Sequence, residues 1–525
     1  MTQQKSEGRI VPQERRKPFP TRETEQPGGG KAVPVKEEDR QLKLAFVPAE
    51  NPLNQSGTER AKLADRSAKQ AHKVPKAKVK PRRACPARME EVLERLEEAF
   101  AHVAANKGAP GPDGRTIEQV RMNLPEILTK LRKAMRDGTY QPGDIRRVWI
   151  PKASGGQRGL GIPNVVDRVI QEAIREVLEP LYEPTFHPSS HGFRPNRGCH
   201  TAIAEAMGYL QEGWNWVVDI DLEKFFDRVN QQRLMSKLAQ RVEDKRLLHL
   251  IGRLLKAKVV MPDGVKIAVE EGVPQGGPLS PLLSNIVLSE LDEELARRGH
   301  RFVRYADDFK IHVRSERAGH RVMASVTRFI ERRLRLKVNT SKSAVARPET
   351  RHFLGFRLQI KADGQVEVLL SERSLKRLRE RIITLTPRSQ GKSLKAIIQK
   401  VNSYLVGWFG YFRICTENIE CWMRFTDAHI RRRLRAVVLK HWKSKRTIAR
   451  RLIRLGVQKK SAWRSVYKGR NRIWALSHSP LVNRGLCNAY FADRGLVSLK
   501  ARFENIWSSV PAPKQLLLPW ESERS

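Results

Sequence analysis

Two acidic segments of the sequence have residue types and spacing suited to chemistry on phosphate. The string Tyr305-Ala306-Asp307-Asp308 places two adjacent carboxylates between the apolar segments RFV and FKIHV, at the tip of an expected hairpin. Two like charges this close cost free energy unless a cation or another partner offsets them. A β-turn that uses Asp for its local hydrogen bonds is the alternative, and the four letters alone do not exclude it.

The second acidic segment strengthens the phosphate interpretation. In VVDIDLEKFFD (residues 217–227), carboxylates end an apolar strand and aromatic residues follow. One of these carboxylates, with Asp307 and Asp308, could hold two divalent ions roughly 3.5–4 Å apart, one activating an attacking hydroxyl and one steadying a leaving phosphate. Magnesium suits an all-oxygen site and keeps several waters, so two or three protein carboxylates suffice. The pattern predicts phosphoryl or nucleotidyl transfer with two Mg²⁺ ions.

The composition favours a polyanionic partner. The 525 residues include 100 Lys plus Arg against 56 Asp plus Glu, a formal net charge of +44, and 40% are hydrophobic. Such an excess in a chain that can build sizeable cores favours a nucleic-acid-binding protein. No apolar run approaches the roughly 18–20 residues of a spanning helix, and the N-terminal residues lack a signal core. The five scattered cysteines fit neither a disulfide framework nor a zinc module.

A mixed fold must position these residues. Apolar side chains at helical spacing predict helices over 89–103 and 166–178. The short segments 214–222 and 301–313 are rich in β-branched and aromatic residues, which is typical of strands. After residue 371 the strand signal fades, and 394–408 again has a helical stripe. The sequence therefore predicts an α+β region followed by a helical one.

Several ordered blocks carry a family resemblance. YADDF after an apolar strand resembles the catalytic motif of reverse transcriptases, and VDIDLEKFFDRVN resembles their first catalytic aspartate motif. The family's five-residue spacing to a bulky aromatic selects Asp221, with Phe226, over Asp219. GAPGPDG and its following helix are similar to the N-terminal extension of group II intron enzymes, so residues 89 to about 512 resemble a group II intron-encoded reverse transcriptase/maturase. The other similar blocks are RRVWIPKASGGQRGLGIP, HGFRPNRGCHTAI, GVPQGGPLSPLLSNI, NTSKS and HFLGF.

The resemblance implies a right-hand polymerase, with fingers and an antiparallel palm sheet, followed by an α-helical thumb or maturase (X) domain. The longest relatives add a His-Asn-His endonuclease with paired cysteines, which we do not expect here, so no second-strand DNA cleavage is predicted. The basic N-terminal tail is equally compatible with a solvated linker and an RNA-contacting arm. The implied organisation is a disordered tail (1–84), fingers and palm (85–370), the maturase/thumb domain (371–450), a basic DNA-binding region (451–512) and a C-terminal tail (513–525).

The resemblance also assigns roles at the nucleotide. The catalytic and metal-binding residues would be the three aspartates Asp221, Asp307 and Asp308. Around the incoming nucleotide each role has a plain structural alternative: a surface loop, a core ring, a tight turn or a solvated lysine. The expected nucleotide contacts are Lys152 and Arg158 with the triphosphate, Phe226 as a bar against a ribose 2′-hydroxyl, Gln275 beside the nucleotide, and Lys342 as general acid for the pyrophosphate.

Basic residues are expected to meet the nucleic acid. Arg194 would contact a template or nucleotide phosphate, or else form an ion pair that supports the fold. Arg431, Arg432, Arg433 and Lys440 extend from a basic amphipathic helix, where they would meet RNA phosphates. A merely solvated charged face is the alternative.

The expected function is an RNA-directed DNA polymerase that binds its group II intron RNA to assist splicing and copies it into DNA during target-primed mobility. Its partners would be the intron RNA, a DNA target and primer, and dNTPs, with no membrane. Its place would be the bacterial cytoplasm at the nucleoid, and no oligomeric state is indicated. An RNA-binding splicing factor with an idle polymerase site and a host-adopted reverse transcriptase are the alternatives.

Overall fold

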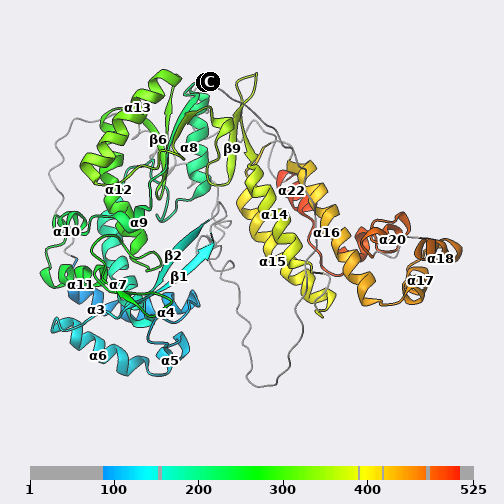
Figure 1. Cartoon of the computed structure of the whole chain (residues 1–525), viewed down its shortest axis with the longest axis horizontal. Coiled ribbons are helices and arrows are strands. Elements are labelled where there is room, and N and C mark those ends of the chain that lie inside the picture. Colours follow the sequence, from blue (N-terminus) through cyan, green and yellow to red (C-terminus); the bar gives the residue numbers. More distant parts are fainter. Residues whose placement is uncertain (1–86, 152–155, 388–390, 417–418, 469–472, 509–525) are drawn as a thin grey trace, which may run out of the picture. The chain divides into compact units, whose positions relative to one another are not determined.

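The protein is described from a computed structural model (Figure 1). The predicted tails at 1–84 and 513–525, and Lys152, lie outside the described residues. No helix in the described part is both long enough and apolar enough to cross a bilayer. The described residues are 87–151, 156–387, 391–416, 419–468 and 473–508.

The N-terminal part packs helices around one long helix, α7. The helical stripe predicted at 89–103 forms two helices rather than one, because the chain turns at Arg95. Its apolar residues are nevertheless all buried, in a core shared with α7, whose position confirms the helix predicted at 166–178. Strands β1 and β2 of this part belong to a four-stranded sheet with the order β2-β1-β4-β5. The elements are α3 (Met89–Glu94), α4 (Leu96–Ala105), α5 (Ile117–Met122), α6 (Leu124–Arg136), β1 (Ile145–Pro151), β2 (Gln157–Ile162) and α7 (Val165–Tyr182).

A four-stranded antiparallel sheet, which we call the central sheet, has the strand order β6-β7-β3-β8. Successive side chains of a strand face opposite sides, and Phe302 and Val303 of β6 join different hydrophobic cores. The first core includes residues of α12 and α13, and the second those of α8, so both faces are covered. The elements are α8 (Cys199–Gln211), β3 (Trp216–Ile220), α9 (Phe225–Arg228), α10 (Gln231–Ala239), α11 (Lys245–Leu255), β4 (Val259–Val260), β5 (Lys266–Ile267), α12 (Ser280–Arg297), β6 (Arg301–Tyr305), β7 (Asp308–Val313), α13 (Glu316–Phe329) and β8 (Ala344–Ala346).

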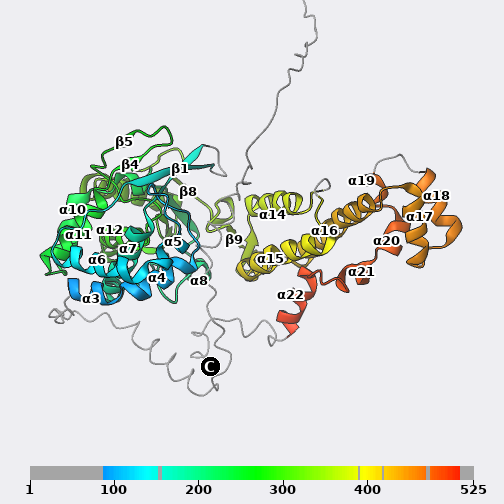
Figure 2. The ribbon, with the colours of Figure 1, turned by 90° about the horizontal axis from the view of Figure 1, so that it is seen from below.

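The rest of the described chain is a hairpin and a run of helices built on the second core. Phe356 of β9 packs against Phe412 of α15, with ring centroids 5.1 Å apart. Helices α14, α15 and α16 lie side by side (Figures 1 and 2). Ser371 caps α14, where the sequence predicts that the helical region begins. The boundary expected between residues 450 and 451 lies inside α17. The elements are β9 (Phe356–Ile360), β10 (Val366–Leu370), α14 (Glu372–Leu385), α15 (Leu394–Phe412), α16 (Ile419–His441), α17 (Lys445–Arg454), α18 (Lys459–Lys468), α19 (Ile473–Leu476), α20 (Pro480–Gly485), α21 (Asn488–Ala492) and α22 (Leu499–Ser508).

Candidate active site

The paired aspartates lie in the turn between β6 and β7. Tyr305 and Asp308 are register partners across the hairpin, which leaves Ala306 and Asp307 as its two loop residues. Ala306 has a φ of 57°, the left-handed backbone that tight two-residue hairpins use. Strand β3 pairs with β7, and Asp221 directly follows its last residue. The sheet therefore brings together the three aspartates predicted from the sequence.

The surroundings of the turn favour a bound cation. Burial raises the pKa of Asp307, where the charge of Asp221 adds to the rise and that of Arg158 opposes it. Burial also raises the pKa of Asp308, although 43% of its side chain is exposed, and nearby Lys310 opposes that rise. A cation held by these carboxylates would offset both burial and mutual repulsion. The donor set consists of carboxylate oxygens alone, which fits magnesium.

Asp221 is held by the loop predicted to follow the active site. Its backbone N–H donates to Ser343 Oγ at 3.0 Å, and its carbonyl accepts from the Asn339 N–H at 2.8 Å. The Lys342 ammonium lies 3.5 Å from Asp221 Oδ2, and both side chains are partly exposed. The predicted general acid therefore lies beside the predicted catalytic carboxylate, and both roles stay predictions.

The neighbouring aspartate, Asp219, is paired within the protein. Its carboxylate lies 2.6 Å from Lys310 and 2.6 Å from Arg351, and only 11% of the side chain is exposed. Arg351 also donates to the Lys342 carbonyl at 2.7 Å, so the pair supports the loop beside Asp221. These contacts agree with the choice of Asp221 over Asp219. The sequence did not indicate these two partners of Asp219, because Lys310 and Arg351 lie 91 and 132 residues away from it along the chain.

Arg158, Phe226 and Gln275 come from three segments that meet near the turn that carries Asp307. Arg158 is exposed on β2, close enough to influence Asp307 electrostatically. The Gln275 carbonyl accepts from the Gly161 N–H of the same strand at 2.6 Å. Phe226 is half-buried, and its carbonyl accepts from the N–H of Val273 at 2.7 Å, two residues before Gln275. The structure thus joins these three predicted nucleotide contacts through backbone hydrogen bonds.

The Gln275 loop approaches β2 so closely that a glycine is required. Gly276 has a φ of 127°, and a Cβ built on it would lie 2.3 Å from the Gly161 carbonyl oxygen. No side chain fits there, and an L-residue rarely adopts that backbone. The segment is therefore the tight structural turn that the sequence left open as an alternative, and the nucleotide contact of Gln275 stays a prediction.

Arg194 uses its donors inside the protein. Its side chain is only 5% exposed and lies 2.8 Å from Glu183. It also donates to the carbonyls of His187 and Ser190, at 2.7 and 2.8 Å. Of the two roles left open by the sequence, this geometry favours the ion pair that supports the fold, and we withdraw the expected phosphate contact.

The arginines predicted on the basic helix are less outward than the sequence suggests. Arg433 donates to the carbonyls of Ile383 and Thr386 at the end of α14, and Arg432 lies over the Trp474 ring at 4.2 Å. Arg431 is half-buried and lines a small cavity beside α21. Only Lys440 among the four is exposed. The sequence predicted this basic helix, α16, but not the neighbours that cover its arginines.

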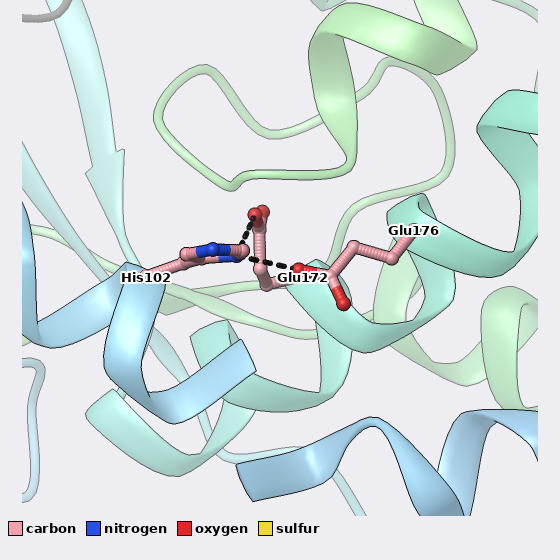
Figure 3. A group of neighbouring side chains, drawn as sticks. All are labelled: His102, Glu172 and Glu176. Atoms are coloured by element: carbon pink, nitrogen blue, oxygen red, sulfur yellow. Dashed lines mark hydrogen bonds and ion pairs between the residues drawn. The ribbon is translucent and has the colours of Figure 1, made fainter. Parts of the chain in front are cut away.

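Another polar cluster ties α4 to α7. Within the described ranges, His102, Glu172 and Glu176 are the one His/Cys/Asp/Glu trio whose ligand atoms all lie within 4.8 Å of one another (Figure 3). His102 Nδ1 lies 2.6 Å from Glu176, and Arg175 lies 2.8 Å from Glu172, so each carboxylate already has a partner within the protein. The three predicted catalytic aspartates are less tightly grouped, which two ions roughly 3.5–4 Å apart would permit.

Comparisons with known proteins show the family of this chain. Residues 150–358 match the family model "Reverse transcriptase (RNA-dependent DNA polymerase)", and residues 375–455 match "Group II intron, maturase-specific domain". Protein YkfC of Escherichia coli K12 is 33% identical over 353 residues, covering 59% of this chain and 89% of YkfC. LtrA, a group II intron-encoded protein of Lactococcus lactis, is 28% identical over 335 residues, covering 51% of this chain and about half (55%) of LtrA.

A solved partial Cas6-RT-Cas1–Cas2 complex is also similar, at 25% identity and a TM-score of 0.31, over 46% of this chain and 42% of that one. Residues 150–358 of this chain, which include its central sheet, therefore form the domain of an RNA-dependent DNA polymerase, a reverse transcriptase. A helical maturase region follows it. The chain belongs to the group II intron reverse transcriptase/maturase family.

Proposed function

We propose that this protein copies RNA into DNA by two-metal nucleotidyl transfer, with Mg²⁺ held by Asp221, Asp307 and Asp308. In the right-hand description of polymerases, the central sheet would be the palm, β1 and β2 part of the fingers, and α14 to α16 the thumb. The observation that carries the proposal is the meeting of Asp221 with the Asp307–Asp308 turn, beside Arg158 and the Gln275 loop.

The protein groups would divide the work at this site. Bound Mg²⁺ would lower the pKa of the primer 3′-hydroxyl and neutralise charge on the leaving pyrophosphate. Arg158 would hold the triphosphate, and the Phe226 ring would leave room for a deoxyribose but not for a 2′-hydroxyl. Lys342, 3.5 Å from Asp221, would give its proton to the departing pyrophosphate.

The same proposal gives the helical region an RNA partner. Exposed Arg446, Arg450 and Arg454 follow one another at four-residue spacing on α17, inside the segment that matches the maturase domain. Such a stripe can neutralise several phosphates of a group II intron RNA, and binding would stabilise the RNA fold that splices. Copying the intron from a DNA 3′ end at a target site would then serve mobility.

Primer extension on an RNA template tests the catalytic assignment. The double change Asp307→Ala with Asp308→Ala is expected to abolish extension, while intron RNA binding and protein-assisted splicing persist. Asp363→Ala provides a matched control, because Asp363 lies in the exposed turn between β9 and β10. Extension by the double variant at the wild-type rate would refute the site. A wild-type protein that assists splicing but never extends a primer would instead favour the idle-site alternative.

A further inference from the structure

An arginine lies directly beneath the catalytic turn, fully buried. Arg304 precedes Tyr305 at the end of β6, and its side chain is 1% exposed. Its Nε donates to Asp292 Oδ1 at 2.7 Å and its Nη2 to Oδ2 at 2.5 Å, from helix α12. The Asp292 side chain has no exposed surface. The two groups therefore form a bidentate ion pair inside the protein.

The third nitrogen of the guanidinium reaches the turn itself. Arg304 Nη1 donates to the Ala306 carbonyl at 2.9 Å and to Asn285 Oδ1 at 3.0 Å. Ala306 is the left-handed residue that lets the chain turn before Asp307. An L-residue rarely adopts that backbone unless its surroundings hold it there. The hydrogen bond from Arg304 fastens the carbonyl of that residue.

Asn285 extends the contact to a third segment. Its Nδ2 donates to the Gly192 carbonyl at 2.9 Å. Gly192 lies so close to the turn that a Cβ built on it would be 2.2 Å from the Ala306 nitrogen. The Asn285 amide therefore bonds at both its oxygen and its nitrogen, to Arg304 and to Gly192, and both of these partners contact the turn.

Helix α12 links this support to the nucleotide loop. The helix begins at Ser280, directly after the Gln275 loop, and Ser280 Oγ donates to the Pro274 carbonyl at 2.6 Å. Asn285 and Asp292 both belong to this helix. One rigid element thus carries the loop beside the nucleotide at its start and holds the catalytic turn further along.

We propose that Arg304, clamped by Asp292 and Asn285, is a positioning residue that fixes the turn carrying Asp307 and Asp308 relative to the nucleotide loop. The inference rests on the polymerase activity proposed above. Stability alone does not account for the arrangement, because a buried ion pair can often be replaced by apolar side chains without loss of stability. A defined geometry for two metal-binding carboxylates does need such a clamp, since a shift of about 1 Å costs about 10²-fold in rate.

The test is single-nucleotide addition by the double variant Arg304→Met with Asp292→Leu, which removes both buried charges together. The kcat is expected to fall about 10²-fold while the KM for the dNTP stays within about twofold, as for an interaction made only in the transition state. A double variant that folds and retains the wild-type kcat would overturn the proposal. Arg233→Met with Glu290→Leu is the control, because it removes an ion pair between α10 and α12 that lies outside the turn's support. Glu290 also pairs with Lys237 and Arg333, so thermal unfolding of both double variants is measured alongside.

The single variant Arg304→Lys and the activity of the wild-type protein complete the test. If the double variant does not fold, Arg304→Lys keeps the charge beside Asp292 but cannot also reach the Ala306 carbonyl. It is expected to lower kcat about 10-fold at unchanged KM, and a wild-type kcat would again overturn the proposal. A wild-type protein that adds no nucleotide would refute the polymerase function and this inference with it, whereas an active wild type with active variants refutes the inference alone.

Discussion

The catalytic end of the central sheet and the basic surface of the helical region solve different physical problems. Around the turn, contacts to the backbone come from several elements, as Ser343 holds the Asp221 N–H and Arg304 holds the Ala306 carbonyl. On α17, Arg446 and Arg450 extend from one exposed helix face. Chemistry needs a few atoms in defined positions, whereas phosphate binding needs accessible charge. The first depends on many distant residues, and the second depends on few.

The sharpest test of this contrast compares two aspartates of one segment. Asp221→Asn is expected to lower kcat for primer extension by on the order of 10³-fold, because a metal ligand loses its charge. Asp219→Asn should chiefly lower stability, since Lys310 and Arg351 lose a buried partner, at a cost of about 3–5 kcal/mol. Primer extension and thermal unfolding of both variants provide the measurements. If Asp219→Asn proved the catalytically dead variant and Asp221→Asn the unstable one, the assignment would be reversed.

A pair of adjacent rings tests the nucleotide side of the site. Phe226→Val is expected to raise incorporation of ribonucleotides relative to deoxyribonucleotides about 10–10²-fold, because removal of the ring opens space for a 2′-hydroxyl. Phe225 is the control, since its ring contacts Phe226 but is buried in the core. Phe225→Val should lower stability by about 1–3 kcal/mol and leave sugar selectivity unchanged. Unchanged selectivity in Phe226→Val would mean that this ring is a core residue only.

The sequence predicted residues well where local spacing carries the information. Strands ending in carboxylates, the YADD turn and the helix start at 371 need only short segments, and the structure has all of them. The sequence did not reveal the ion pairs of Arg304 with Asp292 or of Arg351 with Asp219, because these residues become neighbours only in the folded chain. An arginine inside the apolar strand RFVRY was the one available signal, since an unpaired buried charge is so costly. For Arg194, spacing could not distinguish an outward cation from a buried one.

The basic region is tested by charge removal on α17. Changing Arg446, Arg450 and Arg454 to Gln is expected to weaken intron RNA binding about tenfold or more near physiological salt. The slope of log K against log salt should fall in magnitude by about 2–3, since three phosphate contacts are lost. The matched control changes exposed Arg317, Arg321 and Arg328, which lie along one face of α13, to Gln. Equal losses from both triples would contradict a localised RNA site on α17.

The smallest expected effects come from two basic residues of α16, Arg433, which we expect to support the fold, and Lys440, which we expect to bind phosphate. Arg433→Ala removes donors from the carbonyls of Ile383 and Thr386, and should lower stability by about 1–2 kcal/mol with an unchanged salt slope. Lys440→Ala, from an exposed position, should leave stability unchanged and reduce the slope by about 1. Denaturant unfolding and salt-dependent binding measure the two quantities. The reverse result would mean that Arg433 leaves α14 to meet RNA, and that burial in the free protein does not exclude an RNA contact.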